Sequence, residues 1–395
     1  MRLLDRYVGI FGCWLLTWHR RLAGLFLRRP PVTEPRHILV IKLWGLGSIL
    51  LTGPALRAIK QRYPDARLTF LTFPENVSAV AMLGLADDIW TFDTRSLLRV
   101  LAWVNGFRRR CHREHVDTVL DMEFFSHAPM ILSVLSGARR RVGFFMRGIY
   151  RGDLLTDRCN FNPYRNVVEI FCCFAGRIGA PCDDFSYVRP QVAAEDAVAA
   201  SELLAQCGLP REAPLVALNA SVSELGEELR RWPQERWAEL ADRLVEEAGA
   251  AVVFVAGPSE VPYINATIAA AKRRDMICSL AGKTSVHQLA AVLQLASAVV
   301  SCASGPVPLA ACLGTPTVAL FGSETPVLYG PLGEQHRTIY KGPYCSPCLS
   351  VYNEKIVDFT CDRRCMLDIT VDEVLAATQQ ALAHKREATG HAGGA

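Results

Sequence analysis

Residues 37–72 read HILVIKLWGLGSILLTGPALRAIKQRYPDARLTFLT and contain one repeating unit of structure. The β-branched and apolar run His37–Leu43 predicts a buried strand. The turn WGLGS follows, and apolar residues then recur at helical spacing from Ile49 to Arg62, where Tyr63-Pro64 ends the helix. Arg67–Thr72 predicts a second strand. A strand, a glycine turn, a helix and a strand within about 35 residues form a βαβ unit, whose strands are parallel.

The alternation of strands and helices continues along the chain and restarts once. Further strands are predicted at residues 89–92 and 118–122 in the first half, and at 215–218, 251–256, 276–278, 298–301 and 317–321 in the second, where a helix is predicted at 234–248. The pattern predicts an α/β protein with two doubly wound, Rossmann-like domains at residues 31–190 and 191–380. Ligands of such sheets bind at the carboxyl ends of the strands, so we expect a central cleft between the domains. Residues 381–395 are expected to form a flexible tail.

Composition and charge exclude several classes of protein. Half of the 395 residues are apolar and 21% are charged, which excludes a disordered chain. No uninterrupted apolar run reaches the roughly 18 residues that span a bilayer, which excludes a polytopic membrane protein. The 43 basic and 39 acidic residues give a net charge of +4, and six arginines against one aspartate place +5 within residues 1–30. Because the remainder is close to neutral, a nucleic-acid-binding protein is not expected.

Residues 1–30 predict an amphipathic helix that lies in a membrane interface. At helical spacing, Ile10, Trp14, Trp18, Leu22 and Leu25 form an apolar stripe, while Arg6, Thr17, Arg20 and Arg28 form a polar one. Tryptophan suits the headgroup region and arginine suits anionic lipid, so we expect residues 1–29 to bind a membrane surface. The alternatives are a helix packed on the protein's own core and a secretory signal, although no small-residue cleavage site follows.

The turn Gly45-Leu46-Gly47-Ser48 matches neither common nucleotide-binding loop. It lacks the third glycine of a dinucleotide fingerprint and the Gly-Lys-Ser/Thr of a phosphate loop, so we expect no NAD or ATP site there. We expect a close backbone turn at a helix N-terminus, with Ser48 as the capping residue. Tight packing without any ligand is the alternative.

A stronger candidate for an anion site lies in the second domain. Ser304-Gly305-Pro306 joins a predicted strand to an apolar helix at 309–313, where backbone N–H groups would face a diphosphate. Arg230 and Arg231 in an earlier loop would bind phosphate oxygens, unless they are simply solvated. Glu260 follows the strand at 251–256, a position that suits a ribose hydroxyl.

Six segments, in this order, resemble glycosyltransferase family 9, the bacterial lipopolysaccharide heptosyltransferase family. They lie between about residues 37 and 375 and read HILVIKLWGLGSILLTGPALRAIKQRYPDARL, VLDMEFFSHAPMILSVLSGARRRVGF, RRWPQERWAEL, VFVAGPSE, SLAGKTSVHQLAAVL and SGPVPLAACLGTPTVALFGSETP. The resemblance implies a GT-B fold, with a nucleotide-diphosphate sugar on the C-terminal domain and a lipid-linked saccharide acceptor on the N-terminal one. It also implies an inverting enzyme of cell-envelope glycan synthesis, peripheral on the cytoplasmic side of the inner membrane.

The resemblance assigns residues as well, and the chain departs from the family pattern at three positions. Arg230 stands where the family has a basic phosphate ligand, Glu260 where it has a ribose carboxylate, and Ser304-Gly305 in its phosphate-binding turn. Family members have an aspartate, the proposed base, where this chain has Ser48. They have an aspartate and a histidine where it has Ala303 and Pro308.

A serine of ordinary pKa cannot accept the proton that an aspartate would, so the base must lie elsewhere or the chain must be impaired. Asp121 and Glu123 end the strand at 118–122 and are the candidates for the base. A role as solvated or helix-capping carboxylates is the alternative. A chain without a base would be a degenerate family member that binds a glycolipid or scaffolds a partner transferase.

Eleven of the fourteen cysteines fall into two groups. Those that lie among apolar residues predict buried free thiols: Cys13, Cys159, Cys172, Cys173, Cys207, Cys278 and Cys312. Cys345, Cys348, Cys361 and Cys365 form two close pairs whose spacing matches a tetrahedral four-thiolate metal site. Zinc fits such a site best and iron second, and many family members have a similar cysteine group. Two disulfides and an iron–sulfur redox centre are the alternatives.

Overall fold

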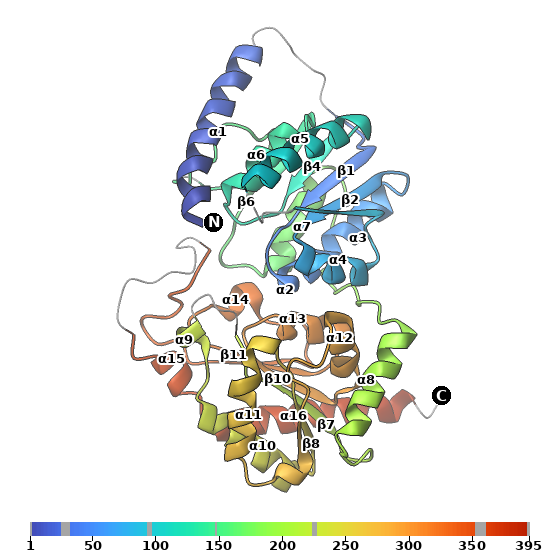
Figure 1. Ribbon diagram of the computed structural model, residues 1–395, viewed down its shortest axis with the longest axis vertical. Helices are drawn as coiled ribbons and strands as arrows, with labels where there is room; N and C mark the ends of the chain where they lie inside the picture. Colours follow the sequence, from blue (N-terminus) through green and yellow to red (C-terminus); the bar gives the residue numbers. More distant parts are fainter. Residues whose placement is uncertain are drawn as a thin grey trace. The chain divides into compact units, whose positions relative to one another are not determined.

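The computed structural model describes residues 2–24, 32–92, 97–146, 148–222, 227–351 and 361–392. It divides into two compact units, Met1–Val188 and Arg189–Ala395, whose elements are labelled in Figure 1. The sequence analysis places this boundary at residue 190. Each unit is a parallel sheet with helical crossovers, which confirms the predicted α/β class and the doubly wound topology.

In unit 1, the described residues form a six-stranded sheet in the order β3-β2-β1-β4-β5-β6, and all neighbouring strands are parallel. The strands are β1 (His37–Ile41), β2 (Arg67–Thr72), β3 (Asp88–Thr91), β4 (Thr118–Asp121), β5 (Arg140–Phe145) and β6 (Asp157–Asn160). The order of the strands changes direction between β1 and β4. In doubly wound sheets, ligands bind at this switch point, beyond the carboxyl ends of the strands.

In unit 2, the described residues form a second six-stranded parallel sheet, in the order β12-β11-β10-β7-β8-β9. The strands are β7 (Leu215–Asn219), β8 (Ala251–Phe254), β9 (Ile277–Ser279), β10 (Ala298–Cys302), β11 (Thr317–Phe321) and β12 (Arg337–Tyr340). Counted from β7, this is the same doubly wound order as in unit 1. Its switch point lies between β7 and β10.

Helices connect the strands in both units. Unit 1 has α1 (Arg2–Gly24), α2 (Leu46–Leu50), α3 (Gly53–Arg62), α4 (Val77–Leu83), α5 (Leu97–Arg113), α6 (His127–Leu135) and α7 (Val167–Arg177). Unit 2 has α8 (Ala194–Gln206), α9 (Glu227–Arg230), α10 (Gln234–Ala248), α11 (Val261–Ala270), α12 (Val286–Leu295), α13 (Pro306–Leu313), α14 (Pro326–Tyr329), α15 (Arg364–Leu367) and α16 (Val371–Ala392). The central strands β1, β10 and β11 are buried along their whole length, as parallel strands covered on both faces must be.

The structure differs from the predicted elements in two respects. The helix predicted from Ile49 to Arg62 is two helices, because Pro54 occupies the first turn of α3 and lacks the N–H that would continue α2. Strands β5, β6 and β12 were not predicted. Their sequences, RRVGFF, DRCN and RTIY, carry charged residues and lack the apolar run that marks a central strand.

The C-terminal residues also differ from the expected flexible tail. From Ala381 onward they continue α16 as far as Ala392. Ala381 and Leu382 are buried, because they extend at helical spacing the apolar stripe that begins with Val374 and Leu375.

The predicted N-terminal helix is present as α1, and it lies beside α6 in unit 1 (Figure 1). Its inner face consists of small residues. A β-carbon at Gly9 would lie 2.4 Å from Cβ of His127 on α6, so only glycine permits this close approach. Cys13 is buried, and the Thr17 hydroxyl donates to the Cys13 carbonyl (2.7 Å) and accepts from the Asp153 amide (3.1 Å).

The outer face of α1 is apolar and exposed. Phe11, Trp14, Leu15, Trp18 and Leu22 recur at helical spacing, and their exposed fractions lie between 48% and 60%. The polar side of the predicted helix therefore faces the protein, where Arg20 donates to the Asp153 carbonyl (2.8 Å). Among the described residues, none of the helices combines the length and the apolar character that crossing a membrane requires.

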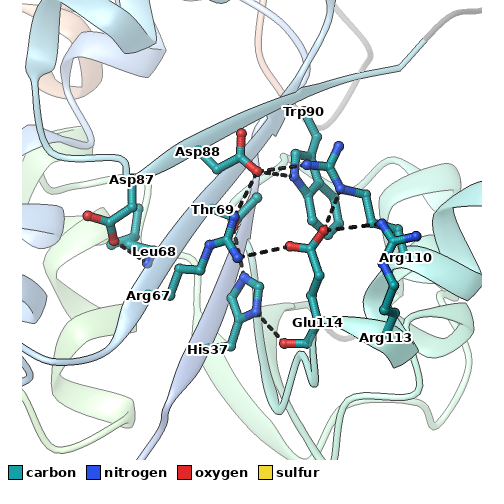
Figure 2. A network of polar contacts seen from close by, with 10 residues as sticks. All are labelled: His37, Arg67, Leu68, Thr69, Asp87, Asp88, Trp90, Arg110, Arg113 and Glu114. Atoms are coloured by element: carbon teal, nitrogen blue, oxygen red, sulfur yellow. Dashed lines mark hydrogen bonds and ion pairs between the residues drawn. The ribbon is translucent and has the colours of Figure 1, made fainter.

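A polar network joins α5 to the amino ends of the first three strands (Figure 2). Asp88 accepts hydrogen bonds from Arg67 (3.2 Å), Arg110 (2.7 Å) and the Trp90 indole (2.8 Å). Burial alone would raise the pKa of Glu114, but Arg110 and Arg67 hold it below its usual value. This network lies at the amino edge of the sheet, opposite to the switch point. It therefore stabilises the unit without taking part in the candidate site at the carboxyl edge.

Two pairs of cysteines correct the prediction of free thiols. Cys172 is bonded to Cys182, and Cys207 is bonded to Cys278. Sequence neighbours gave no sign of these pairs, because each joins segments that only the fold brings together. Cys13, Cys159 and Cys312 are buried thiols outside these disulfides, as predicted, and Cys173 is a half-buried one.

Candidate active site

At the switch point of unit 1, a buried ion pair connects the loops that follow β1 and β4. The Lys42 ammonium donates to Glu123 Oε1 at 2.7 Å, and the two side chains are 1% and 5% exposed. Glu123 Oε2 accepts from the amides of Leu43 (2.7 Å) and Trp44 (3.2 Å). Lys42 also donates to the Trp44 carbonyl (2.8 Å). A buried pair of charges is tolerated only when its other hydrogen bonds are made, and here these bonds go to the backbone of the first loop.

Asp121, the second predicted acid, forms a separate buried pair. Its carboxylate contacts Arg151 at 2.5 Å and accepts from the Glu123 amide at 3.2 Å. Burial raises the pKa of Asp121 to about 6, although Arg151 opposes the shift. The structure thus brings both predicted carboxylates to the switch point, and both are engaged by cations of unit 1.

Ser48 is not the helix cap that the sequence suggested. The N-cap residue of α2 is Gly45, and Ser48 lies inside the helix. Its hydroxyl donates back to the carbonyls of Trp44 and Gly45, each at 2.9 Å. A serine within a helix commonly makes such bonds to the preceding turn, which leaves its oxygen able to accept one further hydrogen bond.

At the switch point of unit 2, hydrogen bonds join the ends of β7 and β10 in a comparable way. The Asn219 amide group donates to the hydroxyls of Ser301 (2.9 Å) and Ser304 (2.9 Å). The Ser221 hydroxyl donates to Oδ1 of the Asn219 side chain (2.6 Å). These bonds orient the turn that begins α13, where Gly305 is the N-cap residue and Pro306 is the first residue of the helix. Pro306 and Pro308 have no N–H, and the amides of Val307 and Leu309 donate to the Ser304 and Gly305 carbonyls, so the backbone donors that this turn can offer an anion are those of Ser304 and Gly305.

The two predicted arginines point to different acids. Arg230 is buried, lies 2.9 Å from Glu324 and donates to the Ala303 carbonyl, so it bridges the loops after β10 and β11. Arg231 donates to both oxygens of Glu260 (2.8 Å each) and lies over the Tyr263 ring, 4.3 Å from its centroid.

A small hollow in unit 2 is lined by Arg230, Ala303, Leu320, Gly322, Ser323, Glu324 and Met366. It places Arg230 next to Ala303, the residue before the Ser304-Gly305 turn. The predicted phosphate-binding residues Arg230, Ser304, Gly305 and Pro306 are therefore neighbours, while Arg231 and Glu260 form a second group near β8.

Two of the predicted metal ligands, Cys348 and Cys365, lie against the turn after β11. The amides of Cys348 and Leu349 donate to the Ser323 carbonyl at 3.0 and 2.8 Å. On the other side, α15 packs so closely that a β-carbon at Gly322 would lie 2.4 Å from the Met366 sulfur and 3.1 Å from that of Cys365. The Arg363 amide donates to the Cys361 sulfur (3.3 Å).

These thiols are near neighbours without forming a closed ligand set. Burial, together with the charges of Cys361, Cys348 and Cys345, raises the pKa of Cys365 to about 11. Within the described residues, no three histidine, cysteine, aspartate or glutamate side chains are placed to hold one metal ion. The structure does not confirm the predicted four-thiolate site; residues 352–360, between the two pairs, lie outside the described part of the chain.

Among the residues of these networks that were not predicted are Lys42, Arg151, Asn219 and Glu324. Lys42 carried a usable signal, since a lysine within the run HILVIKL must find a buried partner. Arg151 and Glu324 lie in loops with no periodic pattern, so only the fold reveals their pairing.

The comparisons with known proteins agree with this architecture. The model of glycosyltransferase family 9 (heptosyltransferase) matches residues 107–355. Lipopolysaccharide heptosyltransferase 2 of Escherichia coli K12 is 28% identical over 347 residues, which cover 82% of this chain and 95% of that protein. A family 9 glycosyltransferase from Veillonella parvula has a TM-score of 0.76 at 19% identity, covering 90% of this chain and 100% of that one.

The solved structure of E. coli ADP-heptose LPS heptosyltransferase II has a TM-score of 0.70 at 21% identity, covering 89% of this chain and 99% of that one. These structural likenesses confirm the predicted GT-B fold. Because the family model matches more than half of the sequence, the chain belongs to glycosyltransferase family 9.

Proposed function

We propose that this protein transfers a heptose from ADP-heptose to a lipid-linked saccharide of the lipopolysaccharide core, with inversion at the anomeric carbon. Membership of family 9 carries the proposal, and the heptosyltransferase relatives supply the substrate class. The two organised switch points support it, because each has backbone and side-chain donors at the edge where doubly wound sheets bind ligands. A degenerate, non-catalytic member finds no support in these relatives.

Unit 2 supplies the donor site in this proposal. The diphosphate lies at the Ser304-Gly305-Pro306 turn, where the amides of Ser304 and Gly305 and the Arg230 guanidinium stabilise the charge that develops on the leaving group. Glu260, which forms an ion pair with Arg231, accepts a hydrogen bond from a ribose hydroxyl.

Thermal unfolding with ADP-heptose tests this donor site. Saturating ligand at about 100 times its Kd adds ~2.7 kcal/mol of stability, and Arg230→Gln should remove most of that gain. Glu324→Gln is the matched control, because it breaks the same ion pair and keeps the guanidinium. Absence of both stabilisation and transfer to heptose-free lipopolysaccharide in the wild type would favour the degenerate alternative.

Asp121 and Glu123 remain the candidates for the proton acceptor. Asp121 has a pKa of about 6, near the range in which a general base works at neutral pH. Asp121→Asn should lower kcat about 100-fold or more while ADP-heptose binding is kept. Glu123→Gln is measured beside it. Wild-type kcat in both variants would exclude both carboxylates.

We propose further that α1 attaches the protein to the cytoplasmic face of the inner membrane. Its exposed face, formed by Phe11, Trp14, Leu15, Trp18 and Leu22, has the aromatic and aliphatic side chains that enter the headgroup region. Deleting α1 is a poor test, since it would remove Cys13 and uncover Met130 and Leu154, which pack against it.

Surface variants test the membrane proposal without unfolding unit 1. Trp14→Glu with Trp18→Glu should abolish sedimentation with anionic liposomes. Val198→Glu with Leu295→Glu adds the same charge at exposed apolar positions of unit 2 and should leave it unchanged. Equal binding by both double variants would refute the role of α1.

A structural metal ion, zinc by preference, is proposed for Cys345, Cys348, Cys361 and Cys365. Their spacing and the attachment of both pairs to the Gly322-Ser323 turn support one shared site. Elemental analysis should find about one metal ion per chain, lost in Cys348→Ser and Cys365→Ser and kept in the buried-thiol control Cys312→Ser. Metal-free folded wild type would refute it, and a colourless protein would exclude an iron–sulfur centre.

A further inference from the structure

Trp44 is the most firmly held residue of the first loop of unit 1. Its N–H donates to Glu123, and its carbonyl accepts from Lys42 and from Ser48. All three partners thus bind the backbone of one residue, and two of them form the buried ion pair. Since exchanging a buried ion pair for apolar residues is often neutral or stabilising, the pair is better explained by the loop geometry that it imposes.

The loop holds an indole ring at the surface of the switch point. Trp44 is 39% exposed although it is a large apolar residue, and its ring packs against Phe73 in a T-shaped contact with centroids 5.3 Å apart. Phe73 in turn stacks on Phe92 at 5.9 Å. The ring therefore has a rigid apolar support on one side and solvent on the other.

We propose that the exposed face of Trp44 is the platform on which a sugar ring of the acceptor saccharide packs. The inference rests on the proposed function, because unit 1 is taken as the acceptor unit. An indole face binds the apolar C–H face of a pyranose, while the ring hydroxyls remain available for hydrogen bonds. Ser48, which donates its proton to the loop, can accept one such bond from the saccharide.

Carbohydrate fits this site better than lipid or protein. The exposed apolar surface at Trp44 is a single ring, next to the exposed Gly45. The membrane-binding face proposed on α1 is, in contrast, a continuous stripe. A single fixed ring beside backbone polar groups is suited to a saccharide, whose faces are apolar and whose rim is polar.

Substitutions that separate ring character from apolar volume test the proposal. Trp44→Phe should stay within about threefold of the wild-type KM for heptose-free lipopolysaccharide, whereas Trp44→Leu and Trp44→Ala should raise it about tenfold or more. The KM for ADP-heptose should not change. Phe185→Ala, at 38% exposure in the same unit, is the matched control and should leave both constants unchanged.

A direct binding measurement distinguishes a failure of the Trp44 proposal from a failure of the proposed function. Calorimetric titration of de-O-acylated, heptose-free lipopolysaccharide should show binding to the wild type and to Trp44→Phe and a loss of about tenfold in Trp44→Leu. Equal affinity of the wild type and Trp44→Leu, with normal transfer, would overturn the platform and leave the proposed function standing. A wild type that binds neither this saccharide nor ADP-heptose would overturn both.

Discussion

Replacing Glu123 by alanine should destabilise unit 1 strongly, because it leaves a lysine charged and buried. Lys42 is 1% exposed, and its ammonium would keep the Trp44 carbonyl and the face of the Phe124 ring, 5.1 Å from the ring centroid, but no opposite charge. Removing one member of a buried ion pair costs about 3–5 kcal/mol. The amides of Leu43 and Trp44 would lose their acceptor as well, which adds to the cost. For a unit of this size, the loss lowers Tm by roughly 6–20 °C.

A double-mutant cycle separates the charge from the hydrogen bonds. Lys42→Met combined with Glu123→Gln removes both charges and keeps an amide oxygen for the loop, so it should cost only about 1–2 kcal/mol. The coupling energy between the two positions should exceed ~2 kcal/mol. Urea unfolding and differential scanning calorimetry at neutral pH measure each variant. A Glu123→Ala cost below about 1 kcal/mol, or strict additivity of the single variants, would refute the reasoning.

Three further predictions follow from other contacts. His336 is buried, neither of its ring nitrogens has a hydrogen-bond partner among the described residues, and burial, with the charges of His384 and Arg337, lowers its pKa to about 4. Because the unfolded chain binds this proton more tightly, stability should fall by about 3 kcal/mol as the pH drops from 6.5 to 4; urea titrations should show His336→Leu losing this dependence and the exposed His112→Leu keeping it. Gly9→Val should detach α1 from α6, seen as faster hydrogen exchange of the α1 amides, while exchange in unit 2 stays the same. Asp242 accepts from the amides of Lys272 and Arg273, so Asp242→Ala should cost about 1–3 kcal/mol in unit 2, and a cost no larger than that of the exposed Asp275→Ala would contradict this.

The repeating pattern of strands was visible in the sequence because parallel strands are buried on both faces. The runs ILVI (38–41), LVAL (215–218), AVVFVA (251–256) and VALF (318–321) are apolar without interruption, and each turned out to belong to a central or near-central strand. The edge strands β6 (DRCN) and β12 (RTIY) have four residues each and mix charged or polar side chains with apolar ones, so they show no pattern long enough to separate them from a loop.

The family motifs located the candidate site as well, because the loops at a switch point come directly after central strands. Residues 44–48, 121–123 and 304–306 were all placed at the carboxyl edge of a sheet before any contact was known. Residue type and position were enough for this step.

Partners and orientations, in contrast, were decided only by the tertiary structure. Lys42 and Glu123 are 81 residues apart, and Arg230 and Glu324 lie in loops after different strands, so their pairing depends on strand order and not on local pattern. The two faces of α1 were correctly separated by helical spacing, yet spacing cannot tell which face meets the protein. That choice was made by Gly9, Cys13 and Thr17, whose small side chains allow the helix to approach α6 closely and turn its aromatic face to solvent.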